Sequence, residues 1–317
     1  MSFKDLLNKK RLYLDGAMGT YLQANGLLLG ELPESMNLRS PETVIAIHKK
    51  YIEVGCDIIT TNTFGANRIK LSGSGLDVEK VVTAAVINAK VARESSSKHK
   101  EIFIALDMSS TGKLLEPLGD LSFEEAYEAY KEQATAGAKA GADLVIIETM
   151  TDTYEMKAAV LAVKENSDLP ILASFSFDER GKLLTGGDIA CAVSLLEGLG
   201  VDALGINCGF GPDIMKGFVK DFLYLSSTPV YIMPNAGVPK IEAGVTVFSS
   251  SPEDFSSIMY EVAKMGAPIL GGCCGTTPDH LRLTIEKCSE VPFNPVDEKN
   301  ISIISSYSKS CIIGEKP

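Results

Sequence analysis

The feature that most constrains the fold is a regular alternation of short apolar runs and longer amphipathic segments over most of the chain. Eight runs have the length and composition of buried strands, at residues 11–14, 57–61, 102–106, 143–147, 170–175, 203–206, 230–233 and 268–270. The segments between and after them have helical spacing, at residues 41–54, 76–95, 122–140, 153–166, 188–199, 213–224, 252–265 and 278–288. Strands that are apolar throughout are buried on both faces, so the pattern predicts a parallel sheet under helices. Eight such units predict an α/β fold, a (β/α)8 TIM barrel, with an open doubly wound sheet as the alternative.

The alternation ends near Ser289, which divides the chain into two parts. Residues 1–288 are expected to form a single domain, the barrel. Residues 289–317 begin with a polar stretch that contains Pro292 and Pro295, and they are expected to form a short C-terminal linker and tail.

Charge and cysteine content limit the partners and the compartment. The net charge of −11 argues against nucleic acid and anionic membrane surfaces as partners, because both attract basic proteins. No apolar run approaches a membrane span, and the first residues do not begin a secretory signal. Seven cysteines in 317 residues do not suggest a small disulfide scaffold, so a reducing cytoplasm is the expected location. Cys56, Cys191 and Cys288 are then expected to be buried apolar residues.

Two adjacent cysteines, Cys273 and Cys274, stand between glycines in the run Gly-Gly-Cys-Cys-Gly. Glycines favour a tight bend that can aim both sulfurs at one point, and adjacent cysteines rarely bond to each other. Cys208 also follows an apolar run and precedes a glycine, so it is the candidate third ligand. Three sulfurs with no fourth ligand at compact spacing predict a catalytic zinc with an open position. Buried apolar cysteines or a redox pair are the alternatives, although a redox pair is usually Cys-x-x-Cys.

The ligand type indicates the chemistry. The histidines His48, His99 and His280 fall in or beside helical segments, so we expect them at the surface and not among the ligands. Zinc bound by three thiolates is a weak Lewis acid, but it can accept a substrate thiol as thiolate. This arrangement is suited to alkyl transfer to sulfur.

Polar residues gather directly after the predicted strands, where barrel enzymes build their sites. They are Asp15, Asn62, Asp107, Glu148, Asn207, Cys208, Asn235, Cys273 and Cys274. Glu148 follows a buried run and should point into the barrel mouth, where an unpaired charge is costly, so it requires a cation. Asp15 could equally be a turn residue before a glycine. Asn235 is either a turn former or a temporary zinc ligand.

Five motifs together resemble the homocysteine S-methyltransferase family. They are DGAMGT at 15–20, TNTF at 61–64, Asn207-Cys208, PNAG at 234–237 and GGCCG at 271–275. The resemblance runs from about Leu12 to Cys288 and is strongest to the N-terminal homocysteine-binding module of cobalamin-dependent methionine synthases.

The resemblance implies a role for each matching residue. Cys208, Cys273 and Cys274 would bind Zn²⁺, and Asp15 and Glu148 would hold the ammonium group of L-homocysteine. The backbone around Ala17, Met18, Thr63, Phe64 and Gly65 would receive its carboxylate, and Asn207 and Asn235 would complete the substrate site.

The resemblance also implies a methyl donor and partners. The expected reaction is methyl transfer from methylcobalamin, carried on another module, to zinc-bound homocysteine, which gives L-methionine. Cobalamin-binding and folate-binding modules, on the same or a separate chain, are the expected partners, and residues 311–317 resemble the first strand of a folate-binding barrel. The alternatives are a standalone enzyme that uses S-methylmethionine or betaine, and a non-catalytic homocysteine-binding protein. The lack of tryptophan argues against a cationic methyl donor, which aromatic residues would bind.

Overall fold

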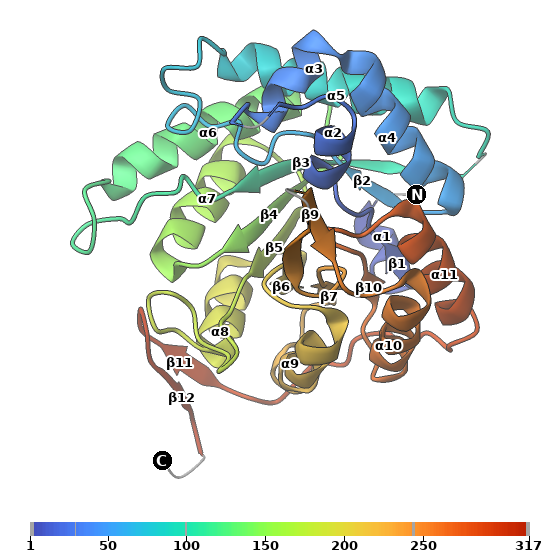
Figure 1. Ribbon diagram of the computed structural model, residues 1–317. Helices are drawn as coiled ribbons and strands as arrows, with labels where there is room; N and C mark the ends of the chain where they lie inside the picture. Colours follow the sequence, from blue (N-terminus) through green and yellow to red (C-terminus); the bar gives the residue numbers. More distant parts are fainter. Residues whose placement is uncertain (1–2, 29, 99, 243–244, 315–317) are drawn as a thin grey trace.

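Eight parallel strands form the centre of the molecule in the computed structural model, which describes residues 3–28, 30–98, 100–242 and 245–314 (Figure 1). Around the barrel the order is β1 (Leu12–Tyr13), β10 (Ile269–Leu270), β7 (Val230–Met233), β6 (Ala203–Asn207), β5 (Ile171–Phe175), β4 (Leu144–Met150), β3 (Phe103–Ser109) and β2 (Ile58–Thr60). A parallel bridge between Leu14 and Ile58 joins the two ends of this order. The predicted (β/α)8 barrel is therefore confirmed, and the open sheet is wrong.

A ring of helices covers the outside of the barrel (Figure 1). Its members are α4 (Pro41–Val54), α5 (Val78–Glu94), α6 (Phe123–Ala140), α7 (Thr153–Asn166), α8 (Ile189–Leu199), α9 (Pro212–Leu225), α10 (Pro252–Lys264) and α11 (Pro278–Cys288). Each was predicted, and each end differs from its predicted position by at most two residues. Local signals explain this agreement. In α6, Ser122 and Glu125 form a capping box at the start, and Gly141 ends the helix at a φ of 83°.

Four short helices were not predicted: α1 (Phe3–Leu6), α2 (Gly19–Ala24), η1 (Pro33–Ser35) and α3 (Met36–Arg39). They are too short to show helical periodicity in the sequence. Helix α1 closes the amino-terminal end of the barrel, where the Phe3 ring meets the Phe103 ring edge-on at a centroid distance of 5.3 Å. The carboxyl ends of the strands therefore form the open end.

The alternation of side chains along the strands determines which residues face the open end. In β4, Leu144 and Ile146 belong to the cluster inside the barrel, whereas Val145 and Ile147 pack outward against the helices. Because side chains alternate with a period of two, the next inward position in β4 is Glu148. The same count places Asp107 inward at the end of β3, after Phe103 and Ala105.

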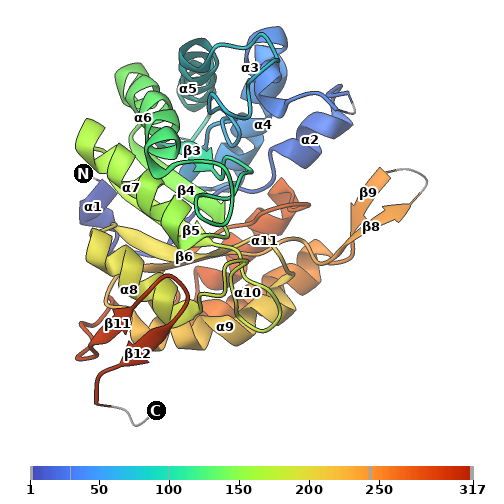
Figure 2. The ribbon, with the colours of Figure 1, turned by 90° about the vertical axis from the view of Figure 1, so that its left-hand side faces the viewer.

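Two hairpins add to the predicted architecture. Strands β8 (Pro239–Glu242) and β9 (Val245–Phe248) pair antiparallel and project away from the barrel in Figure 2. Strands β11 (Ile303–Ser305) and β12 (Ser310–Ile312) form a second hairpin that contacts α8.

The second hairpin gives structure to the tail that was expected to be a linker. Ile303 and Ile312 pack against the main hydrophobic core, and the Ser310 hydroxyl donates to Asp188 at 3.0 Å. Burial against α8 supplies the stability that such a short segment lacks alone. A folate-binding domain after this point stays a prediction. Of residues 311–317, which resemble the first strand of a folate-binding barrel, residues 315–317 lie outside the described residues.

The expectation for the histidines was wrong at two positions. His48 is fully buried in α4, and His280 is buried at the start of α11, where its Nδ1 accepts a hydrogen bond from the Thr277 N–H at 3.1 Å. His99 lies outside the described residues. Among the helices that the structure describes, none is long and apolar enough to span a membrane.

Candidate metal centre and substrate cavity

Three cysteines meet at the open end of the barrel. Cys208 follows β6, and Cys273 and Cys274 follow β10, so β7 lies between the two sites. Backbone hydrogen bonds to the end of β7 hold both loops: the Cys208 N–H donates to Met233 at 3.1 Å, and the Cys273 N–H donates to Pro234 at 2.8 Å. The three sulfur atoms lie within 4.8 Å of one another. The structure thus brings together the three predicted ligands.

The backbone at Cys208 has a left-handed φ of 59°, which residues other than glycine rarely adopt. Such strain is concentrated at functional sites, where surrounding contacts enforce it. Here the strained turn points the Cys208 sulfur toward the other two.

The donor set fits a thiolate-binding metal. Hydrogen bonds from the Cys273 and Cys274 thiols lower the pKa of Cys208 to about 3. The same contact with Cys208 raises the pKa of Cys274 to about 12 and raises that of Cys273 well above its usual range. The three thiols therefore shift one another's pKa values strongly, and a divalent cation that replaces their protons would stabilise all three as thiolates. Sulfurs around a tetrahedral zinc, each about 2.3 Å from the metal, lie about 3.8 Å apart, which is within the observed spread.

The remaining cysteines lie apart from this cluster. Cys56, Cys191 and Cys288 are buried, as predicted, and Cys311 is exposed in the second hairpin.

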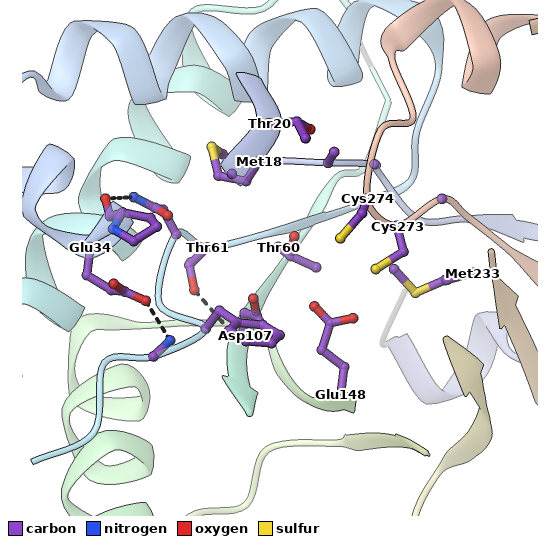
Figure 3. Close-up of a pocket in the computed structure, with 18 of the residues that line it drawn as sticks. Met18, Thr20, Glu34, Thr60, Thr61, Asp107, Glu148, Met233, Cys273 and Cys274 are labelled. Carbon is purple, nitrogen blue, oxygen red and sulfur yellow. Dashed lines mark hydrogen bonds between the residues drawn. The ribbon is translucent and has the colours of Figure 1, made fainter. Parts of the chain in front are cut away.

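A cavity of about 450 Å³ opens beside the cysteines (Figure 3). Seven of the predicted site residues line it: Ala17, Met18, Phe64, Gly65, Glu148, Cys273 and Cys274. Five predicted residues are not part of its lining: Asp15, Thr63, Asn207, Cys208 and Asn235. These five are close to the cavity wall and contact the residues that form it or the cysteine cluster.

Glu148 is the acidic residue at the end of β4. The strand register shifts between Ile147 and Met150, and Thr149 has a left-handed φ of 58°. A bulge of this kind commonly re-aims a side chain next to an active site. The Glu148 side chain points into the cavity although the residue is only 7% exposed, and burial raises its pKa to about 8.

Asn207 positions Glu148 and does not face the cavity. Its Nδ2 donates to Glu148 Oε2 at 2.7 Å and to Thr149 Oγ1 at 2.7 Å, and its Oδ1 accepts from the Thr149 N–H at 2.7 Å. Asn207 is fully buried and comes directly before Cys208. One side chain therefore connects the acidic wall of the cavity with the cysteine loop.

Asp15 and Thr63 are also held within the protein. The Thr60 N–H donates to Asp15 Oδ2 at 2.9 Å, and the Thr60 hydroxyl donates to Asp15 Oδ1 at 3.1 Å. Burial raises the pKa of Asp15 to about 7. The Thr63 hydroxyl donates to the Asp107 carbonyl at 2.7 Å. Asn235 is buried beside the cysteines, and its amide donates a hydrogen bond that helps to lower the Cys208 pKa.

Two N–H groups that were expected to receive a carboxylate already have partners. The Ala17 N–H donates to Thr276 Oγ1 at 3.2 Å, and the Gly65 N–H donates to Glu34 Oε1 at 2.6 Å. Glu34 is buried, so its carboxylate requires a donor of this kind. Met18 and Phe64 line the same part of the cavity.

Sequence reasoning placed Asp107 at the site end of the barrel but gave it no specific role, and it gave none to other lining residues, among them Glu34, Thr60, Thr61 and Lys70. Strand alternation adds that Asp107 faces inward. Glu34 and Lys70 come from segments between strands with no comparable signal. Lys70 is the single lysine or arginine in the described lining, and its Nζ lies 5.1 Å from the centre of the Phe64 ring.

Three convergent cysteines and a buried carboxylate at the open end of a parallel barrel define a barrel protein with a candidate thiolate metal site. The sequence profile of the homocysteine S-methyltransferase family matches residues 12–288, so the chain belongs to that family.

Curated relatives include two methionine synthases. The chain is 33% identical over 295 residues to the methionine synthase of Mycobacterium tuberculosis. The aligned region covers 88% of this chain and 24% of that protein. It is 31% identical over 325 residues to the methionine synthase of Mycobacterium leprae, and this alignment covers 96% of this chain and 27% of that protein. The chain thus spans about a quarter of the length of these relatives.

Solved structures share the fold. The oxidized form of the homocysteine methyltransferase MmuM from Escherichia coli matches with a TM-score of 0.74 at 24% identity, over 87% of this chain and 96% of that one. Its metallated form matches with a TM-score of 0.73, also at 24% identity, over 90% of this chain and 99% of that one.

Proposed function

We propose that this chain catalyses zinc-dependent methyl transfer to the thiol of L-homocysteine, giving L-methionine, with methylcobalamin on another module as the methyl donor. The observation that carries the proposal is the convergence of Cys208, Cys273 and Cys274 beside a cavity with a buried glutamate. Family membership supports the methyl acceptor, and the names of the two mycobacterial relatives support the methionine synthase reaction.

Cys208, Cys273 and Cys274 would hold the metal. Zinc bound there would keep a substrate thiol deprotonated and electron-rich at neutral pH, so that its sulfur can attack a methyl carbon. The protein's own contribution is to aim the three sulfurs, through the strained turn at Cys208 and the hydrogen bonds to the end of β7.

Glu148 binds the substrate ammonium group in this proposal. Its carboxylate lines the cavity on the same side as Cys273 and Cys274, and Asn207 fixes its orientation. A buried carboxylate without a cation is unfavourable, and an amino-acid ammonium supplies the missing charge.

The substrate carboxylate is directed toward the other end of the cavity. Met18 and Phe64 supply backbone there, and Lys70 supplies a positive charge. Both charged ends of a zwitterionic thiol are then matched, whereas a simple alkyl thiol has neither contact.

The methyl donor is tested by incubating the zinc-loaded protein with homocysteine and each of methylcobalamin, S-methylmethionine and betaine. We expect methionine to form with methylcobalamin and not with the other two. Turnover with S-methylmethionine or betaine alone would support the standalone enzyme, a reading consistent with the fold shared with MmuM. Homocysteine binding without turnover on any donor would support a binding protein.

We expect Glu148→Gln to weaken homocysteine binding by about 1.5–3 kcal/mol, the usual contribution of a hydrogen bond to a charged group. Zinc content should not change, because Glu148 is not one of the three sulfur ligands. Calorimetry on the zinc-loaded protein measures the effect. The control ligand is 4-mercaptobutanoate, which is homocysteine without its amino group and should lose little affinity. Equal weakening of both ligands would assign Glu148 a structural role.

A further inference from the structure

Asp107 has an unsatisfied carboxylate oxygen inside the substrate cavity. The residue is 6% exposed, its side chain lines the cavity, and Oδ1 is buried without a hydrogen-bond partner in the described part of the chain. Buried polar atoms in native proteins are almost always paired. An unpaired carboxylate oxygen that faces a cavity therefore indicates a ligand with a hydrogen-bond donor.

The side chain next to Asp107 on the neighbouring strand is also acidic. Strands β3 and β4 are adjacent, and both Asp107 and Glu148 point inward from their ends. Burial raises the pKa of Asp107 well above its usual range, and the nearby carboxylates of Glu148, Asp15 and Glu34 raise it further. The Asp107 and Glu148 carboxyl groups lie close enough for each to shift the pKa of the other. Two carboxyl groups in this contact share a proton unless a cation takes its place.

The described cavity lining holds a lysine that acts on Asp107 electrostatically but makes no direct ion pair with it. Lys70 is the single basic side chain in the described lining, and it lies against the Phe64 ring. No ion pair joins Lys70 to Asp107 among residues 3–28, 30–98, 100–242 and 245–314. Among the described residues, Asp107 Oδ1 is therefore left without a direct protein partner, and a cationic ligand can supply one.

Asp15, the aspartate implied by the resemblance, is less suited to this contact. Both of its carboxylate oxygens accept hydrogen bonds from Thr60, and its side chain does not form part of the cavity lining. Asp107 differs on both points.

We propose that Asp107, together with Glu148, binds the ammonium group of the amino-acid substrate and so selects amino-acid thiols over other thiols. This inference rests on the proposed function and adds a substrate contact to it. An ammonium group has three N–H donors, so it can satisfy both carboxylates at once. A thiol without an amino group would leave the pair as it is in the free protein and would gain nothing from Asp107.

The test compares two ligands on zinc-loaded protein by calorimetry. Asp107→Asn should raise the Kd for L-homocysteine roughly tenfold to a hundredfold and leave that for 4-mercaptobutanoate within about twofold. Asp152→Asn is the matched control, because Asp152 is also buried with an unpartnered oxygen but caps α7 outside the cavity. It should leave both Kd values unchanged.

Thermal unfolding and zinc content show whether Asp107→Asn folds. If it does not, Asp107→Ser, with its smaller side chain, replaces it in the test. Asp15→Asn, measured in parallel, should reduce the selectivity for homocysteine less than Asp107→Asn does. Equal weakening of both ligands by Asp107→Asn, or a selective loss in Asp15→Asn alone, would overturn the inference. If the unaltered zinc-loaded protein binds 4-mercaptobutanoate but shows no preference for homocysteine, the proposed substrate fails, and the role of Asp107 fails with it.

Discussion

The purified, reduced protein is expected to bind about one Zn²⁺ per chain, and replacing Cys208, Cys273 or Cys274 with Ser should remove both the zinc and the methyl transfer. Two remaining thiolates are too few to hold the metal tightly in a site with one position open to substrate. The barrel should stay folded, because its core is formed by strands and helices and not by the metal. Metal analysis after dialysis, circular dichroism and methionine formation measure the three outcomes.

The chain offers a matched control for these variants. Cys311 is exposed in the second hairpin and lies apart from the cluster, so Cys311→Ser should keep full zinc content and activity. Stoichiometric zinc in Cys208→Ser would show that the ligand set is wrong. Loss of fold in all three cluster variants, but not in the control, would instead make the metal structural.

A methyl-loaded cobalamin module supplied in trans should raise the rate of methionine formation roughly tenfold or more over free methylcobalamin at equal concentration. A cavity of about 450 Å³ holds an amino acid but not a corrinoid, so the donor must present its methyl group at the open end of the barrel. Docking of a module converts random collisions into oriented ones. Tethering would raise the effective concentration further, to the millimolar range of short flexible linkers.

The same module carrying cobalamin without a methyl group is the control, and it should give no methionine. A rate no higher than with free methylcobalamin, together with rapid turnover on S-methylmethionine, would contradict the proposed donor. The enzyme would then be a standalone homocysteine methyltransferase.

Local patterns in the sequence were sufficient for most of the fold. The period of the apolar residues located all eight barrel strands and the eight covering helices, because burial on one or both faces is repeated along each element. Elements without such a repeat were missed. Helix α2 has six residues, and the β8–β9 hairpin has two strands of four residues.

The sequence by itself also predicted the candidate metal ligands, because Cys208 and the Cys273–Cys274 pair come shortly after apolar strands and stand next to glycine. The carboxyl ends of parallel strands meet at one end of a barrel, so residues at those positions converge whatever their distance along the chain. Cys208 and Cys273 are therefore predictable as neighbours.

The tertiary structure alone decided which polar atoms remain available to a ligand. Asn207 donates a hydrogen bond to Glu148, 59 positions away, and the Gly65 N–H donates one to Glu34, 31 positions away. Asp15 and Asp107 are both aspartates after strands, yet Thr60 satisfies the first and the second keeps a free oxygen in the cavity. A residue's type and position fix what it can donate or accept, whereas its partners depend on contacts between distant segments that no local pattern records.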